Sequence, residues 1–290
     1  MRIEKVLNNN VVLSRNEQGE EIVYMGRGLA FQKKIGDTIN PDYVEKEFVL
    51  KDSAMAGQFQ QLFEDVPTKE VEVVKQIVDL AETTLAIELS SNIYLTLTDH
   101  IHYALLRAKE GIDIPNPLVF ETRKFYPKEF EIAKQALAII AEKLEVQFSE
   151  NEAGFIAFHI VNAEQGNGNM EVTMEATKMV RDILTIISRY FGQVFDEDSL
   201  NYQRIVTHLQ YFAQRYLKQE AHDEEDEFLF ALVQGKYPKA FQAVQRINEY
   251  LLKSYDRPID QAPLHASRLS LVVRVVRQKA SAGEPVSLPQ

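Results

Sequence analysis

The apolar residues change their period along the chain, and this change most constrains its fold. In about the first 50 residues, short β-branched or alternating segments at 3–7, 11–14, 21–25 and 47–50 lie between turn-forming residues. From about Thr68 onward, apolar residues recur every three or four positions, as on one face of a helix. The sequence therefore predicts a small antiparallel β-sheet followed by a mostly helical remainder.

Five apolar stripes carry the helical spacing, and each would bury one face of an amphipathic helix. They consist of Val71, Val74, Val78 and Ala81; Ile93, Leu97, Ile101 and Leu105; Phe130, Ala133, Leu137, Ile140 and Leu144; Ala176, Met179, Ile183 and Ile187; and Phe241, Val244, Ile247 and Leu251. No apolar run approaches the roughly 20 residues that a membrane-spanning helix needs. The N-terminus also lacks the pattern of a signal peptide. We therefore expect a cytoplasmic protein without stable membrane insertion.

The helical part contains an internal repeat. The segment KFYPKEF at residues 124–130 returns as GKYPKAF at 235–241, and Asp99-His100 corresponds to Thr207-His208. The repeat predicts two tandem all-α helical-bundle domains of about 110 residues each. We expect the β-sheet domain over residues 1–57, the helical domains over 65–170 and 171–280, and a tail over 281–290.

The placement of the histidines is the most informative sign of chemistry. Taken singly, a histidine on the apolar face of a helix is more often a hydrogen-bonded core residue than a functional one. The repeat favours function here, because His100 and His208 take equivalent places in two otherwise different copies. His159 follows Ser149 and Glu152, whose spacing is that of a helix N-terminal capping box. A neutral imidazole can accept a proton, a metal or a phosphoryl group.

Several classes of catalytic and metal site find no support. The chain has no cysteine, which excludes disulfides, thiolate zinc sites and cysteine nucleophiles. His100 and His102 are two residues apart, and on a helix such side chains point about 200° apart and chelate a metal poorly. A helical metalloenzyme built on His100, His159 and His208 remains an alternative, but we expect no metal and no cofactor.

One segment of the predicted sheet domain suits nucleic acid. Arg27, Phe31, Lys33 and Lys34 combine groups that stack on unpaired bases and groups that meet phosphates. The whole chain has a net charge of −11, and residues 1–57 hold eight basic against nine acidic residues. RNA binding would therefore depend on a local surface and its shape rather than on bulk charge.

Several independent segments resemble one family. KVLNNNVV and MGRGLAFQKK resemble the co-antiterminator RNA-binding domain of the BglG/SacY-type bacterial transcriptional antiterminators, typified by the β-glucoside and sucrose operon regulators. The segments IYLTLTDH, NEAGFIAFHIVNAE and SLNYQRIVTHLQYFAQR resemble the two phosphotransferase-system (PTS) regulation domains of the same proteins. The resemblance covers residues 1 to about 255.

The resemblance implies an RNA-binding homodimer. Its N-terminal domain would bind a hairpin in a leader mRNA and prevent an overlapping terminator from forming upstream of a sugar-utilisation operon. The RNA contacts that it implies are Lys5, Asn9, Asn10, Gly26, Arg27 and Phe31. Asn offers hydrogen-bond donors and acceptors, and Gly allows close backbone approach. Arg can stack on a base or bind a phosphate, and Phe can stack on a base.

The resemblance also implies control by phosphorylation and not the turnover of a substrate, so we do not expect an enzyme. A sugar-specific enzyme II permease would phosphorylate His100 and His159 in the first regulatory domain and inactivate the protein. The phosphocarrier HPr would phosphorylate His208 in the second domain and activate it. The family's fourth histidine falls at Ser270 or Leu271 here, and His265 is the nearest candidate.

One alternative belongs to another class of regulator. PTS-regulated DNA-binding activators place helix-turn-helix modules ahead of the regulatory domains. The strand pattern of the N-terminal segment favours the RNA-binding hypothesis.

Overall fold

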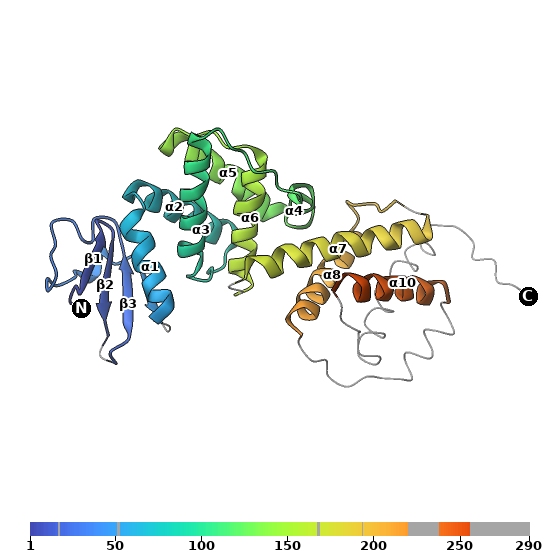
Figure 1. Cartoon of the computed structure of the whole chain (residues 1–290), viewed down its shortest axis with the longest axis horizontal. Coiled ribbons are helices and arrows are strands. Elements are labelled where there is room, and N and C mark those ends of the chain that lie inside the picture. The colour runs from blue at the N-terminus through green and yellow to red at the C-terminus, as the bar shows by residue number, and fades with distance from the viewer. Residues whose placement is uncertain (17, 51–52, 167–168, 193, 220–237, 256–290) are drawn as a thin grey trace, which may run out of the picture. The chain divides into compact units, whose positions relative to one another are not determined.

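The computed structural model describes residues 1–16, 18–50, 53–166, 169–192, 194–219 and 238–255 (Figure 1). The chain divides into two compact units, Met1–Met170 and Glu171–Gln290. The first contains a β-sheet and a helical bundle, and the described part of the second is helical. The predicted fold class, a small antiparallel sheet followed by all-α regions, is confirmed.

The sheet is an antiparallel meander in the order β1-β2-β3-β4. Its strands are β1 (Lys5–Asn8), β2 (Val11–Arg15), β3 (Glu21–Met25) and β4 (Lys46–Leu50). Between β3 and β4 the chain forms a long loop with one 3₁₀ turn, η1 (Pro41–Tyr43). The described part of the N-terminal segment thus holds strands where a DNA-binding activator would place a helix-turn-helix.

Both faces of the sheet carry buried side chains, because its residues alternate between two cores. On one face Val12, Ile22 and Tyr24 pack with Ile39 of the long loop. On the other face the apolar side chains join a core that continues into the helices, and they are Leu7, Val11, Leu13, Val23, Met25 and Phe48. The sheet and the helical bundle of the first unit therefore share one hydrophobic core.

Helix α1 (Ser53–Asp65) provides that connection, and sequence patterning did not predict it. Its rings Phe59 and Phe63 are buried in the shared core, and Phe59 lies 5.9 Å from Phe48 of β4, measured between ring centroids. The helix packs against β1, β4 and the bundle helix α3 (Ile93–Lys109). Figure 1 shows α1 lying alongside the sheet.

The bundle of the first unit contains, besides α3, four further helices. These are α2 (Thr68–Leu85), α4 (Val119–Phe125), α5 (Pro127–Leu144) and α6 (Glu150–Glu164). The helix boundaries follow local chemistry. Pro127 occupies the first turn of α5, where its missing N–H costs nothing. Ser149 caps α6 by accepting a hydrogen bond from the backbone N–H of Asn151.

In the second unit, the described helices are α7 (Met170–Phe191), α8 (Leu200–Lys218) and α10 (Pro238–Tyr255). A shift of 111 positions carries α5 onto α10, as the repeated segment predicted. Tyr250 of α10 donates a hydrogen bond to Asp182 of α7 at 2.8 Å. The ring of Tyr255, also on α10, lies 5.9 Å from the ring of Tyr216 on α8, measured between centroids. His265 and the predicted tail lie outside the described residues.

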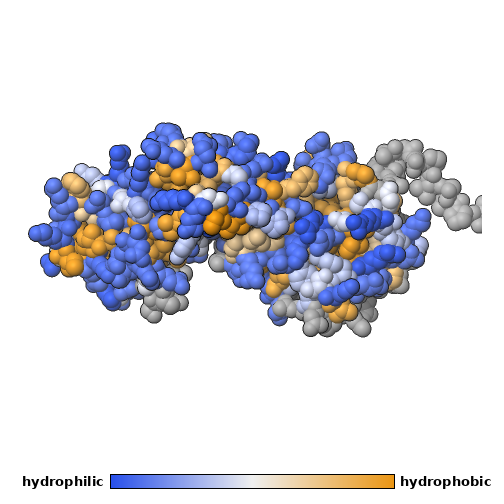
Figure 2. All heavy atoms as spheres, turned by 45° about the horizontal axis from the view of Figure 1, so that its top comes forward, coloured by the Kyte–Doolittle hydropathy of each residue, from blue (hydrophilic) through white to orange (hydrophobic). Residues whose placement is uncertain are grey.

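Among the described residues, no helix is both long enough and apolar enough to cross a membrane. On the face drawn in Figure 2, hydrophilic residues occupy most of the surface, with hydrophobic patches between them.

Candidate RNA-binding surface and histidine cluster

The loop that follows β3 approaches the rest of the sheet domain so closely that only glycine fits at its start. Gly26 is buried, and a Cβ built on it would lie 1.8 Å from the carbonyl oxygen of Tyr43. Its N–H donates to the carbonyl oxygen of Asn10 at 2.9 Å. Gly26 therefore sets the path of the backbone, and its neighbours supply the exposed side chains of the loop.

Asn10 holds this loop from the β1–β2 turn. Its Oδ1 accepts a hydrogen bond from the N–H of Gly28 at 2.8 Å, and its Nδ2 donates to Oε1 of Glu72 on α2 at 2.9 Å. The side chain is only 7% exposed. In this structure Asn10 shapes the loop and contacts the helical bundle at the same time.

The other predicted RNA contacts lie around this loop. Arg27 and Phe31 are exposed, and Phe31 is the more notable because 61% of a large apolar side chain faces solvent. Asn9 is also exposed, and its carbonyl oxygen accepts from the N–H of Ala30. Lys5 is half-buried and pairs with a carboxylate of α1. The loop thus presents a cation and an aromatic ring four positions apart, on a backbone held in place by Gly26 and Asn10.

A second polar cluster lies between α3 and α6 and contains two of the predicted histidines. Nε2 of His100 lies 2.9 Å from Oε2 of Glu152, and Nη2 of Arg107 donates to the other carboxylate oxygen at 3.1 Å. The rings of His100 and His159 are 4.9 Å apart between centroids. Nδ1 of His159 lies 3.3 Å from the hydroxyl of Thr96. Prediction had placed the histidines on helices, and the structure brings His100 and His159 together.

Burial and neighbouring charges set the ionisation of this cluster. Burial alone would raise the pKa of Glu152, but hydrogen bonds and charges from His100 and Arg107 outweigh it and hold that pKa below its usual value. Burial, with a smaller contribution from His100, lowers the pKa of His159 well below its usual value. His159 is therefore a neutral imidazole near pH 7, and Glu152 is a carboxylate.

Both rings line a pocket of about 440 Å³, together with Asp99, Arg107 and Asn162. The pocket gives an incoming group access to the two imidazoles. His102 does not line it: Nδ1 of His102 lies 2.8 Å from Oε2 of Glu70 at the start of α2. Neighbouring histidines of α3 thus have separate partners, as their spacing predicted.

The remaining histidine candidates belong to the second half of the chain. His208 is exposed on α8, in the second unit. The described residues contain no group of three or more His, Cys, Asp or Glu side chains that could hold a metal ion. Sequence patterning missed Arg107 and Thr96, and it had assigned Glu152 to a capping box. The carboxylate of Glu152 instead reaches across to α3.

Comparisons with known proteins show similarity over most of the chain. Residues 1–56 match the model of the CAT RNA binding domain, and residues 75–163 and 181–262 match that of the PRD domain. The chain is 41% identical to the transcription antiterminator LicT of Bacillus subtilis over 96% of this chain and 100% of the relative. It is 39% identical to a beta-glucoside operon antiterminator of Dickeya chrysanthemi over 91% of this chain and 93% of the relative.

Two solved structures are also similar. A crystal structure of GlcT CAT-PRDI is 37% identical with a TM-score of 0.51, and covers 56% of this chain and 96% of that chain. A structure of the LicT antiterminator protein in complex with its RNA target is 56% identical with a TM-score of 0.18. It covers 19% of this chain and 98% of that chain.

Proposed function

The chain belongs to the family of transcription antiterminators that join a CAT RNA binding domain to PRD domains, and from this premise we propose which of its residues bind RNA and which receive phosphoryl groups. Residues 1–57 bind a hairpin in the leader mRNA of a sugar-utilisation operon. That binding prevents the terminator from forming, so that polymerase continues into the operon.

The observation that carries the RNA site is the loop after β3. Arg27 and Phe31 are exposed on a backbone that Gly26 and Asn10 hold in place. An exposed ring stacks on an unpaired base, and a guanidinium stacks or pairs with phosphate. Lys5, Asn9 and Asn10 complete the proposed surface, and Gly26 lets the loop backbone pack closely against Tyr43 beneath that surface.

The regulatory domains are residues 65–170 and 171–280. In the first, a sugar-specific enzyme II permease transfers a phosphoryl group to His100 or His159. The neutral state of His159 and the pocket beside both rings support this role, because an unprotonated imidazole nitrogen is the nucleophile in such a transfer. A phosphoryl group adds a charge of about −1.5 to −2, which is repelled by the carboxylate of Glu152.

In the second regulatory domain, HPr phosphorylates His208, whose exposed imidazole can reach a protein donor. His265 is a further candidate acceptor. These transfers regulate the protein and turn over no substrate. We place the protein in the cytoplasm as a homodimer, where the leader mRNA and both phosphoryl donors are available.

RNA binding is tested by the equilibrium affinity of the full chain for the RNA target of the solved LicT complex, at one fixed salt concentration. Arg27→Ala and Phe31→Ala should each weaken binding by about 10- to 100-fold, as expected when a base or phosphate contact is lost. Phe120→Ala is the matched control, since Phe120 on α4 is 60% exposed. If all three variants bound the RNA as tightly as the parent, the loop would not be part of the RNA-binding site.

Phosphorylation is tested with purified PTS components and mass-spectrometric mapping. Phosphorylated HPr without the permease should label His208, and addition of the phosphorylated permease should label His100 or His159. His102 serves as an internal control, because it lies next to the cluster but does not line its pocket. If the permease labelled neither His100 nor His159, their assignment as phosphoryl acceptors would be refuted.

A further inference from the structure

Two of the proposed RNA contacts are held by carboxylates of the helices beside the sheet. Nδ2 of Asn10 donates to Glu72 on α2 at 2.9 Å, and Nζ of Lys5 lies 2.5 Å from Oε1 of Glu64 on α1. Asn10 is only 7% exposed, so it presents little surface to RNA while Glu72 binds it. RNA would therefore compete with Glu72 for Asn10 and with Glu64 for Lys5.

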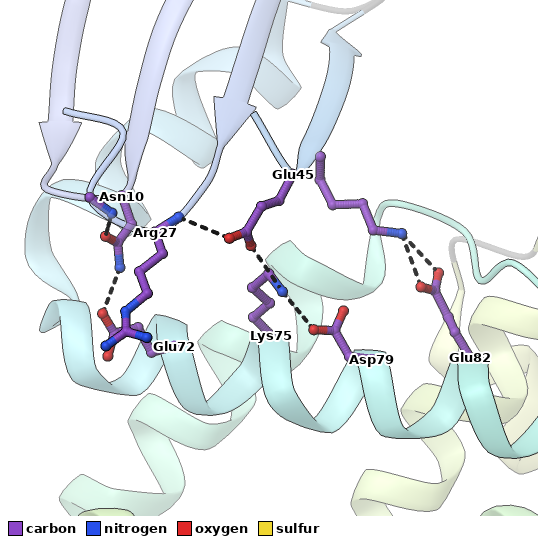
Figure 3. A network of polar contacts seen from close by, with 9 residues as sticks. Asn10, Arg27, Glu45, Glu72, Lys75, Asp79 and Glu82 are labelled. Atoms are coloured by element: carbon purple, nitrogen blue, oxygen red, sulfur yellow. Dashed lines mark hydrogen bonds and ion pairs between the residues drawn. The ribbon is translucent and has the colours of Figure 1, made fainter. Parts of the chain in front are cut away.

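A network of further contacts fastens α2 to the same side of the sheet domain (Figure 3). Nζ of Lys46 on β4 lies 2.9 Å from Oε2 of Glu82 on α2. Glu45, which precedes β4, pairs with Lys75 of α2 at 3.0 Å and accepts from the N–H of Arg27 at 3.3 Å. In Figure 3 the side chain of Arg27 points toward α2.

The helix that makes these contacts belongs to the bundle that carries the histidine cluster. Glu70, two residues before Glu72, pairs with His102 of α3, and α3 also carries His100. The contacts with Asn10 and Lys46 thus connect the RNA-binding domain to its regulatory domain.

We propose that Glu64 and Glu72 form an internal competitor of RNA, which must leave Lys5 and Asn10 before the hairpin can bind. This inference rests on the proposed RNA site. Carboxylates on α1 and α2 bind the same donors that RNA phosphates and bases require, and like charge repels the RNA backbone. The described structure is then a closed form of the RNA-binding domain, and RNA binding requires α2 to separate from the sheet.

Removal of the two carboxylates tests the competition in the full chain. Glu64→Ala/Glu72→Ala is compared with Glu131→Ala/Glu142→Ala, which removes two exposed carboxylates of α5 and changes the net charge equally. The probe is the RNA target of the LicT complex at fixed salt. We expect roughly 5- to 30-fold tighter binding for the first variant, and a change of less than about 2-fold for the second.

The outcomes separate the inference from the proposed function. Equal affinities of the two double variants would overturn the competition, even if both bind RNA. Absence of binding by the parent and both variants would overturn the proposed RNA site, and the competition with it.

A crosslink tests the separation of α2 directly. The chain has no cysteine, so Lys46→Cys/Glu82→Cys introduces the only two thiols, at an ion pair outside the proposed RNA contacts. A short bis-maleimide that joins them would keep α2 on the sheet. The crosslinked protein should bind the RNA at least about 10-fold more weakly than the same variant with both thiols singly capped. Equal binding by the two forms would overturn the proposal.

Discussion

The carboxylate of Glu152 lies 2.9 Å from Nε2 of His100, although 52 residues separate them in the sequence. The side chain of Glu152 is 4% exposed, so its charge depends on its partners for stabilisation. Arg107 provides the second partner. This arrangement places a buried negative charge beside the proposed phosphoryl acceptor.

Replacing Glu152 with Gln should therefore destabilise the unphosphorylated protein. The amide keeps the shape of the side chain, but Arg107 loses its counter-charge, and we expect a loss of about 1–3 kcal/mol in the free energy of unfolding. Chemical denaturation measures it. Glu150→Gln on the exposed side of the same helix should change stability by less than about 0.5 kcal/mol. Equal stability of the two variants would show that the cluster contributes no net stability.

Stability should also depend on the protonation of His159. Burial lowers its pKa well below the usual 6.5, so below about pH 6.5 the unfolded chain binds a proton that the folded chain resists. The free energy of unfolding should then decrease as the pH is lowered. This group contributes at most about 1.4 kcal/mol per pH unit to the decrease. The pKa of Glu152 is also lowered, so its contribution is lost only below its usual value of 4.5.

Denaturation at several pH values between about 7.5 and 5.5 measures this dependence. His159→Gln should flatten the slope, whatever its effect on absolute stability. Phe120→Ala removes an exposed side chain that carries no titratable group and should leave the slope unchanged. A slope that persists in the His159 variant would assign the pH dependence to other groups.

Local patterns were enough to predict most of the secondary structure. The four strands and the helical stripes depend on residues close in sequence, and the buried residues Val71, Leu97 and Ile183 lie on the predicted faces. Helix α1 was missed because Phe59, Leu62 and Phe63 are its main apolar side chains after Gly57. These three side chains form too short an apolar stripe to indicate a helix by themselves, and their role is seen only where they pack in the core that the sheet shares.

The sites were predicted less completely, because their partners are distant in sequence. The spacing of Ser149 and Glu152 is that of a capping box, and Ser149 does cap α6. Glu152 contacts α3 instead, which no local pattern encodes. The contact of Asn10 with Glu72 spans 62 residues and likewise requires the tertiary fold.

Gly26→Ala should disrupt the RNA-binding loop. The added Cβ would lie 1.8 Å from the carbonyl oxygen of Tyr43, and backbone rather than a flexible side chain would have to move. We expect a loss of about 2–4 kcal/mol in the free energy of unfolding, together with loss of RNA binding. In contrast, Gly57→Ala lies in α1 with no neighbour within 4 Å of the new Cβ, and should stabilise the protein by about 0.5–1 kcal/mol. Unchanged RNA affinity of the Gly26 variant would refute the role of this backbone approach.

Replacing His100 should uncouple the protein from its permease. His100→Ala removes the proposed acceptor, so a reporter placed behind the leader terminator should be expressed without the inducing sugar. His100→Asp places a permanent negative charge near Glu152, as a phosphoryl group would, and should keep the reporter off even with the sugar. Lys109→Ala on the same helix should respond to the sugar like the parent. If His100→Ala still required the sugar, inhibition would depend on another residue, and His159, 4.9 Å away between ring centroids, would be the acceptor to replace next.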